Sequence, residues 1–262
     1  MLIIIGIAFA VLFFFVTYSG KHLSLSGAIL LSAVITFFAL FSLWNLLLLL
    51  MVSYGVLMVI DKLTRVKRAA IIGNIHKKSG KRTGVQVFAN GFAAILSVVL
   101  YLTTKEKMFL IVYAVGVGET FADSIASDIG ILSRRMPRDI CTLKRIAPGL
   151  SGGVSMLGII ASVLVSVLFG LLAYFCIHLS MVEMLLIAAL AMLGCIIDSL
   201  LGSLVQAKYQ CIVCGVPTEK EQHCEATTQH VGGFRLIDNC TVNFISNSAV
   251  CGLCVLLLIY MK

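Results

Sequence analysis

Residues 107–130 read KMFLIVYAVGVGETFADSIASDIG. In this stretch an apolar run is followed, within ten residues, by three carboxylates: Glu119, Asp123 and Asp128. A helix needs about 20 apolar residues to cross the hydrocarbon core of a bilayer, so the stretch predicts a transmembrane helix whose last turns carry acids. A carboxylate at the centre of a membrane helix costs about 2.5–3.5 kcal/mol. The depth of these acids in the membrane therefore decides what they do.

The whole chain has the composition of an integral membrane protein. Of its 262 residues, 60% are hydrophobic and only 12% are charged, and the mean hydropathy is +1.06. These values predict an all-α, polytopic helical membrane protein that forms a single integral membrane domain over residues 1–262. About eight transmembrane helices (seven to nine) are expected, at residues 2–18, 26–42, 43–61, 84–103, 107–129, 153–176, 181–205 and 241–260.

The basic residues divide unevenly between the connections. Those that follow the first, third, fifth and seventh segments hold 17 of the 20 Lys and Arg residues. Basic residues favour the cytoplasmic side, which predicts cytoplasmic odd-numbered connections and both termini outside, in a multi-pass protein of the cell membrane. The first segment has no basic n-region and no small-residue cleavage site, so we interpret it as a retained helix. The net charge of +8 suits anionic lipid head groups and phosphorylated ligands. Nucleic acid is not an expected partner.

With this topology, polar residues from distant parts of the chain share one depth. They lie near the cytoplasmic ends of the fourth, fifth, seventh and eighth segments: Asn90, Asp123, Asp128, Asp198, Asp238, Asn239 and Asn243. Each acid alone could be neutralised by a nearby Arg or Lys, or could reach the head groups. Converging carboxylates instead favour Mg²⁺ that bridges to substrate phosphates, with Asp123, Asp128 and Asp198 as its ligands. Glu119 lies deeper and is not expected to bind the ion.

The GLSGGVS stretch (149–155) opens the sixth segment and faces the same compartment. Closely spaced glycines at a helix start leave backbone N–H groups for an anion, which the helix dipole also favours. Ser151, Gly152 and Gly153 are therefore candidate phosphate ligands, with Lys144 from the loop before them. The alternative is that the glycines serve only the turn.

SGKRTG (79–84) looks like a Walker A motif but does not match one. No Gly stands five residues before Gly80, and Arg82 follows Lys81 where the motif needs Ser or Thr. Lys81 and Arg82 are still expected to pair with phosphates or head groups.

The seventh connection, residues 206–240, is predicted to be a cytoplasmic loop with a possible metal site. It contains CIVC-x8-HC, formed by Cys211, Cys214, His223 and Cys224. Disulfides are rare in the cytoplasm, and one CxxC with a later His and Cys can complete a structural Cys₃His zinc knuckle. Because adjacent His and Cys are awkward joint ligands, His230 could replace His223. Reduced thiols without a metal are the alternative.

Several of these blocks occur together in a known family. FADSIASDIG, followed by Pro137, Thr142 and PGLSGGVS, resembles the (A/G)DTWASE(L/I)G…P…T…GTNGGVS signature of the transmembrane-protein-19-like family, domain of unknown function ninety-two. IIDSLLGSLVQAKYQCIVCG, HVGGFRLIDNCTVNF and KSGKRTGVQVFANG are similar to further blocks of that family. The resemblance covers most of the chain from about residue 20 onward. Ile125, Asp128 and the pair Leu150-Ser151 stand where the family has Trp, Glu and Thr-Asn.

The resemblance implies both a site and an activity. The family's motif acids fall on Asp123, Asp128, Asp198 and Asp238, its amides on Asn90, Asn239 and Asn243, and its glycine pair on Gly152 and Gly153. A plant member of the family is a phytyl-phosphate kinase, and related membrane lipid kinases use CTP. The expected function is Mg²⁺-dependent phosphoryl transfer from a nucleoside triphosphate, CTP by this analogy, to an isoprenoid monophosphate at the cytoplasmic interface.

Two other functions fit the same residues. A CTP-dependent cytidylyltransferase acting on a lipid phosphate would use the same metal and substrates, and would differ only in the phosphorus that is attacked. A lipid-phosphate or ion transporter would use intramembrane acids for cations, but it predicts polar groups near the bilayer centre and often inverted repeats. Here the polar groups gather in one leaflet, and no repeat is evident.

Overall fold

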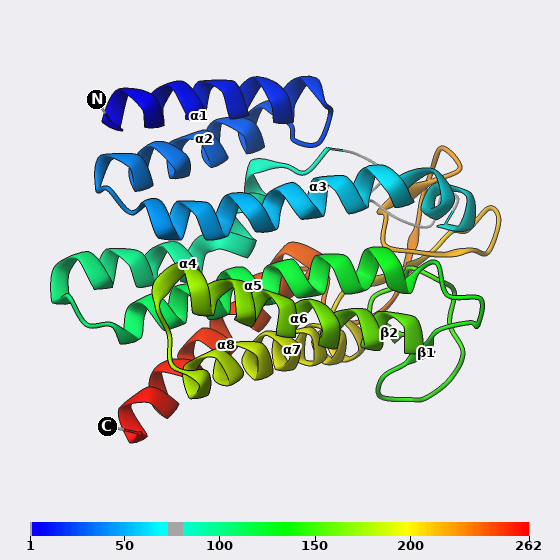
Figure 1. Cartoon of the computed structure of the whole chain (residues 1–262). Coiled ribbons are helices and arrows are strands. Elements are labelled where there is room, and N and C mark those ends of the chain that lie inside the picture. Colours follow the sequence, from blue (N-terminus) through cyan, green and yellow to red (C-terminus); the bar gives the residue numbers. More distant parts are fainter. Residues whose placement is uncertain (1, 73–80, 262) are drawn as a thin grey trace.

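The structure, a computed structural model, describes residues 2–72 and 81–261 and consists mainly of helices (Figure 1). Eight helices form within these residues: α1 (Leu2–Ser19), α2 (Leu25–Leu40), α3 (Trp44–Ile72), α4 (Gly84–Thr104), α5 (Met108–Gly130), α6 (Met156–Ile177), α7 (Met181–Leu204) and α8 (Asn239–Tyr260). Six of them, α3 to α8, are long and apolar enough to cross a membrane, and α1 and α2 are shorter apolar helices. The prediction of an all-α protein with about eight membrane helices is confirmed.

Successive helices run in opposite directions, so the two ends of the chain lie at the same end of the bundle (Figure 1). The α5–α6 and α7–α8 connections lie at the opposite end, together with the last turns of α3. At the end that holds the termini, Lys107 Nζ before α5 lies 2.8 Å from Glu183 Oε2 on α7. The α5–α6 and α7–α8 connections and the basic last turns of α3 therefore share one end of the molecule, as the alternation of charge predicts.

Helix α5 is the centre of the bundle and packs against α3, α4, α6, α7 and α8. Small residues allow this close approach, as they do in many membrane helices. A Cβ atom at Gly116 would lie 3.1 Å from both Ala94 Cβ and Cys251 Sγ, and one at Gly118 would lie 2.7 Å from the Phe169 ring. The carboxylates of the opening stretch are thus on the most enclosed helix of the protein.

Two boundaries differ from the sequence prediction by more than two residues. The third helix continues past residue 61 to Ile72, because no Gly or Pro interrupts the basic segment that follows the apolar one. The sixth helix begins at Met156 rather than 153, because the Ser155 hydroxyl accepts a hydrogen bond from Gly158 N–H (3.1 Å) and caps it.

Short antiparallel strands in the connections were not predicted. β1 (Arg138–Asp139) pairs with β2 (Gly153–Val154) inside the α5–α6 connection. The α7–α8 connection holds a three-stranded sheet in the order β4-β3-β7 and a separate β5–β6 hairpin. Their bounds are β3 (Lys208–Gln210), β4 (Pro217–Thr218), β5 (Gln222–His223), β6 (Ala226–Thr227) and β7 (Gln229–Gly232).

The turn between α1 and α2 holds the entry to α4. Ser24 N–H donates to Arg82 O (2.9 Å), and Arg82 N–H donates to His22 O (3.1 Å). Ser26 Oγ accepts a hydrogen bond from Gly84 N–H (3.1 Å). These contacts fix the backbone of Arg82 at the end of the bundle that carries the basic loops.

Candidate active site

Glu119 is the deepest member of a polar cluster between α5, α7 and α8. Its side chain is 3% exposed and packs against Gly194 of α7, where a Cβ atom would lie 2.2 Å from Glu119 Cγ. Ser246 Oγ donates to Glu119 Oε1 (3.2 Å), and Asn247 Nδ2 donates to Oε2 (2.6 Å). A buried carboxyl group requires such partners, so Glu119 joins the three helices and needs no metal to be satisfied.

Asp123 and Asp198 lie one helical turn beyond that contact, toward the end that carries the basic loops. Asp123 follows Glu119 by four residues on α5, and Asp198 follows Gly194 by four on α7. Since α5 and α7 run in parallel, one turn on each helix keeps the two carboxylates on facing sides. Both also interact electrostatically with the Cys195 thiol on α7. The structure therefore places these two predicted residues at the same level of α5 and α7, near Cys195.

A row of side-chain amides connects this pair to α4. Asn239 Nδ2 donates to Asn243 Oδ1 (3.0 Å), and Asn243 Nδ2 donates to Asn90 Oδ1 (3.0 Å). With its amide turned over, Asn243 would instead donate to Asp198 Oδ2 at 3.1 Å. Either way, the Asn243 amide lies between Asp198 and Asn90. The three amides predicted from the sequence thus lie together beside Asp198.

Asp128 lies apart from that pair, contrary to the expectation that three aspartates share one ion. Its Oδ1 accepts a hydrogen bond from Arg68 Nη1, and Arg68 Nη2 also pairs with Asp61 Oδ1. Five residues along a helix turn a side chain by about 140°, so Asp128 faces α3 while Asp123 faces α7. The extension of α3 supplies the arginine. Asp128 is an ion-pair partner in this structure.

The other predicted acid and the predicted basic residues lie around the rim. Asp238 is exposed and caps α8, because its Oδ1 accepts hydrogen bonds from Thr241 N–H (3.0 Å) and Thr241 Oγ1 (3.1 Å). Lys81 Nζ lies 4.9 Å from the centre of the Tyr18 ring, a cation–π contact. Lys144 is exposed in the α5–α6 connection.

The GLSGGVS stretch forms a turn and strand β2, and only its last residue, Ser155, caps α6. Gly152 has φ +82° and packs against α7, where a Cβ atom would lie 2.7 Å from the backbone of Ser203. Ser151 N–H donates to Glu219 Oε1 (3.0 Å), and the Ser151 hydroxyl donates to the same oxygen. Gly153 N–H donates to Leu150 O (3.1 Å). The loop thus already binds a carboxylate of the protein, and binding of a phosphate at Ser151 requires that Glu219 be displaced.

Asp139 holds the α5–α6 connection against α7. Its Oδ1 accepts hydrogen bonds from Cys141 N–H (3.1 Å) and Thr142 N–H (2.8 Å), and its Oδ2 accepts one from Ser203 Oγ (2.7 Å). Burial favours the neutral acid, but these hydrogen bonds outweigh it and hold the pKa of Asp139 below its ordinary value. Thr142 of the family signature therefore has a structural role here.

An apolar cavity of about 460 Å³ opens between α2, α3, α4 and α5. Most of its wall is aliphatic or aromatic, and its polar members are Ser53, Tyr54, Arg82, Gln86, Asn90, Tyr113 and Thr120. Along α4 the lining extends from Gln86 to Val99, which is about 20 Å at 1.5 Å per residue. Ligand cavities in proteins commonly measure 300–1,000 Å³. Asn90 belongs both to this cavity and to the row of amides that leads to Asp198.

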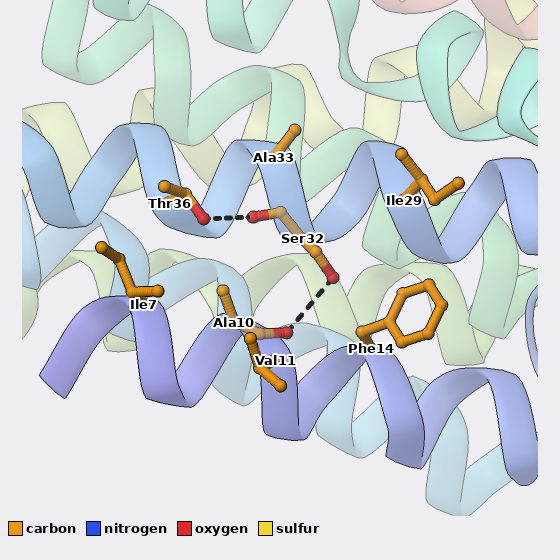
Figure 2. Close-up of a pocket in the computed structure, with 8 residues that line it drawn as sticks. All are labelled: Ile7, Ala10, Val11, Phe14, Ile29, Ser32, Ala33 and Thr36. Atoms are coloured by element: carbon orange, nitrogen blue, oxygen red, sulfur yellow. Dashed lines mark hydrogen bonds between the residues drawn. The ribbon is translucent and has the colours of Figure 1, made fainter. Parts of the chain in front are cut away.

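A second hollow lies between α1 and α2 (Figure 2). It measures about 290 Å³ and is lined by Ile7, Ala10, Val11, Phe14, Ile29, Ser32, Ala33 and Thr36. Its two hydroxyl groups are bonded to the backbone, Ser32 Oγ to Ala10 O (3.2 Å) and Thr36 Oγ1 to Ser32 O (2.9 Å). No titratable side chain belongs to the lining.

Sequence reasoning missed several residues of this region. Ser246 and Asn247, which bind Glu119, extend the polar face that Asn239 and Asn243 begin on an otherwise apolar α8. That spacing of four residues was visible in the sequence. The partners Arg68 and Glu219 were not, because each contacts a residue about 60 or more positions away.

Comparison with known proteins agrees with the membrane fold. The family model of Integral membrane protein DUF92 matches residues 8–251. The chain is 30% identical to Protein PGR of Arabidopsis thaliana over 275 aligned positions, which cover 93% of this chain and 92% of that protein. It is 31% identical over 143 positions to an uncharacterized membrane protein of Methanocaldococcus jannaschii, covering 52% of this chain and 59% of that one. No solved structure matches. The chain therefore belongs to the DUF92 family of integral membrane proteins.

Proposed function

We propose that this protein is a Mg²⁺-dependent membrane lipid kinase. It transfers a phosphoryl group from a nucleoside triphosphate, CTP by the family resemblance, to an isoprenoid monophosphate, and the product is the diphosphate. The observation that carries the proposal is the long apolar cavity, because one of its lining residues, Asn90, accepts a hydrogen bond from Asn243, whose amide lies beside Asp198. A membrane cavity with aliphatic walls and a polar edge suits a lipid with a charged head group.

The lipid chain occupies the apolar part of the cavity, between α2, α3 and α4. Leu50, Phe92 and Val99 are among the residues that would contact it. Arg82 is the cation of the cavity lining, and it would pair with the lipid phosphate at the membrane surface. Asn90 would orient that phosphate toward α5 and α7.

The residues at the carboxylate pair fit Mg²⁺. This ion prefers oxygen ligands and is usually bound by one or two carboxylates together with substrate phosphates. Asp123 and Asp198 would hold it, with Asn243 or Asn239 nearby to bind its water ligands or the substrate. When bound, Mg²⁺ neutralises charge on the transferred phosphoryl group. Asp128 is proposed to act through its ion pair with Arg68, not as a ligand.

The chemistry then needs positioning more than a base. An oxygen of the lipid phosphate is already anionic, so it attacks the γ-phosphorus without prior removal of a proton. The bond from the γ-phosphorus to the bridging oxygen breaks, and the nucleoside diphosphate leaves with that electron pair. Basic residues of the loops, Lys144 among them, would bind the nucleotide, and Ser151, Gly152 and Gly153 would contact its phosphates after Glu219 moves away.

The proposed location is the cell membrane, with the site at the cytoplasmic face. Support comes from the gathering of the α5–α6 and α7–α8 connections, with the last turns of α3, at the end of the bundle where α5 and α7 end (Figure 1). Nucleotides are cytoplasmic, so this orientation gives the two substrates access from opposite sides of the site.

The test is product analysis with the purified protein in nanodiscs, Mg²⁺ and a panel of prenyl monophosphates. With CTP labelled at the γ-phosphate we expect labelled lipid diphosphate, and with CTP labelled at the α-phosphate we expect label only in CDP. The matched variants are Asp123→Asn and, at the far end of the bundle, Glu183→Gln, which should keep full turnover.

Two results would overturn the kinase assignment. Transfer of the α-label to lipid with release of pyrophosphate would identify a cytidylyltransferase. Absence of product with any nucleoside triphosphate, together with phosphate-lipid movement across the bilayer, would identify a transporter. Full activity of Asp123→Asn would remove the carboxylate pair from the mechanism.

A further inference from the structure

The α7–α8 connection carries a compact group of metal-binding side chains outside the helix bundle. Cys211 and Cys214 lie between β3 and β4, while His223 ends β5 and Cys224 follows it. Their sulfur and ring nitrogen atoms all lie within 4.8 Å of one another. Among residues 2–72 and 81–261, it is the one group of three or more His, Cys, Asp and Glu side chains whose ligand atoms lie close enough together to hold a metal ion.

We propose that Cys211, Cys214, His223 and Cys224 bind one structural Zn²⁺ ion. Zn–S and Zn–N bonds of about 2.3 Å and 2.0–2.1 Å in a tetrahedral shell place two ligand atoms roughly 3.5–4 Å apart. His223 Nδ1 lies 3.5 Å from Cys214 Sγ and 3.2 Å from Cys224 Sγ. These separations lie close to those of one zinc shell, and Cys₃His is a donor set of closed structural sites.

The backbone around the cysteines supports this assignment. Gly215 has φ +70°, and its N–H donates to Cys211 O (2.9 Å), so the chain turns back directly after Cys214. Val213 N–H donates to Cys211 Sγ (3.4 Å), the kind of outer contact that stabilises a metal ligand. On the other hairpin, Cys224 and Glu225 both have left-handed backbone conformations (φ 52° and 59°). This two-residue turn is what permits His223 and Cys224, adjacent in sequence, to approach the same sulfurs.

Other arrangements account for fewer of these contacts. A disulfide would join two of the three sulfurs and would leave the third thiol and the imidazole ring without a role. The alternative histidine, His230, instead packs its ring edge-on against Tyr209, with 5.5 Å between ring centroids. His223 is therefore the ligand that the geometry selects, and His230 is excluded from the cluster.

The proposed ion would also hold the rim of the candidate active site. Glu219 lies between the two ligand pairs in the sequence, and its carboxylate accepts hydrogen bonds from the N–H and hydroxyl groups of Ser151. Gly152, the next residue, packs against Ser203 of α7. A zinc ion at the cluster would therefore hold the segment that carries Glu219 in place, and with it the contact of Glu219 with Ser151 of the α5–α6 connection. The zinc site does not depend on the kinase activity, and its test does not use that activity.

The first experiment measures zinc by mass spectrometry in the full-length protein purified without chelator. We expect one Zn²⁺ per chain in the wild type and in Cys141→Ser, an exposed cysteine of the neighbouring connection. Cys224→Ser and Cys214→Ser should retain less than a tenth of that zinc. Should these variants fail to fold, Co²⁺ added to the chelated wild-type protein provides a second measurement. Intense visible bands with thiolate charge transfer are expected.

Three outcomes decide the proposal. Equal zinc in Cys224→Ser and wild type would overturn it, as would wild-type protein that takes up neither zinc nor cobalt. A disulfide among Cys211, Cys214 and Cys224 in fresh protein would overturn it too. Trypsin tests the link to the rim: chelation should raise cleavage at Lys144 and Arg145 several-fold. Glu219→Gln should do the same without loss of zinc, and unchanged cleavage on chelation would exclude the link.

Discussion

Two hollows of the bundle, the cavity beside α4 and the crevice between α1 and α2, have similar apolar walls and different polar edges. The cavity lined by α2, α3, α4 and α5 includes Arg82 and Asn90, and Asn90 accepts a hydrogen bond from Asn243, which lies beside Asp198. In the crevice between α1 and α2, the hydroxyl groups of Ser32 and Thr36 are hydrogen-bonded to backbone carbonyls of these two helices (Figure 2). Any lipid-facing groove of a membrane protein can accommodate an acyl chain. What distinguishes a substrate site is a polar edge that leads to reactive groups.

The carboxylates provide the strongest test of that distinction. Asp198→Asn keeps the shape of the side chain but removes the charge that Mg²⁺ needs, so we expect a loss in kcat of about 10³-fold, roughly 4 kcal/mol of transition-state stabilisation. Asp123→Asn should behave alike, and the two losses should not add because both residues act on one ion. Steady-state kinetics over a range of Mg²⁺ concentrations checks this. Two independent, additive losses would contradict a shared ion.

The apolar wall can be changed without touching the polar edge. Gly91 lines the cavity, and a Cβ atom added there meets no neighbour within 4 Å. Gly91→Leu should therefore fold, fill part of the cavity and raise KM for the lipid at least tenfold, with the KM for CTP unchanged. Gly252→Leu is the matched control, because this exposed glycine of α8 also has open space around it. Equal effects of the two substitutions would show that the cavity does not bind the lipid.

Asp128 is expected to have a structural role, unlike the proposed ion-binding pair Asp123 and Asp198. Its partner Arg68 is 15% exposed and Asp128 is 11% exposed, and a hydrogen bond to a charged group contributes about 1.5–3 kcal/mol. We expect Asp128→Asn to lower the melting temperature by several degrees and to leave the Mg²⁺ dependence of turnover unchanged. Arg68→Gln should give a similar loss, and the double variant should lose less than the sum. A shifted Mg²⁺ dependence in Asp128→Asn would return this residue to the metal site.

Sequence patterns predicted the helices and the end of the bundle to which the polar residues belong. Apolar segments and the unequal distribution of Lys and Arg are one-dimensional features, so they identified the eight helices and the end of α5 and α7 that carries Asp123 and Asp198. The amides Asn90, Asn239 and Asn243 followed from the same argument, because depth is set by position along a helix.

The interaction partners of these side chains, and the rotation of each helix about its own axis, could not be predicted in this way. Asp123 and Asp128 both lie near the same end of α5. The rotation of α5 about its axis directs Asp123 to α7 and Asp128 to α3. The Glu219–Ser151 contact depends on how two loops fold against each other. The cavity depends on how α2, α3, α4 and α5 pack, which no periodicity in the sequence reports.

The stability of the protein should depend on pH through Asp139, which holds the α5–α6 connection at the rim of the site. Its pKa is depressed in the folded protein, so its contribution to stability is present above its ordinary value of about 3.9 and is lost as the pH falls through the folded pKa. Asp139→Asn should cost about 1 kcal/mol at neutral pH. Thermal unfolding between pH 3 and 7 should show the difference from wild type narrowing below about pH 4. A difference that widens on acidification would contradict this role.

A bulky substitution in the crevice between α1 and α2 should affect turnover and lipid KM less than one in the cavity beside α4. Val11 lines it and is 52% exposed, so Val11→Trp places a large apolar ring in the crevice toward lipid, without displacing a polar group. If α1 and α2 serve only to enclose the bundle, kcat and both KM values should stay within about twofold of wild type, since surface substitutions change stability by about 0.5 kcal/mol or less. The measurement is the same assay as for Gly91→Leu, with the same lipid panel. A rise in lipid KM comparable to that of Gly91→Leu would mean that lipid enters between α1 and α2, and the polar edge would then not be the feature that separates the two hollows.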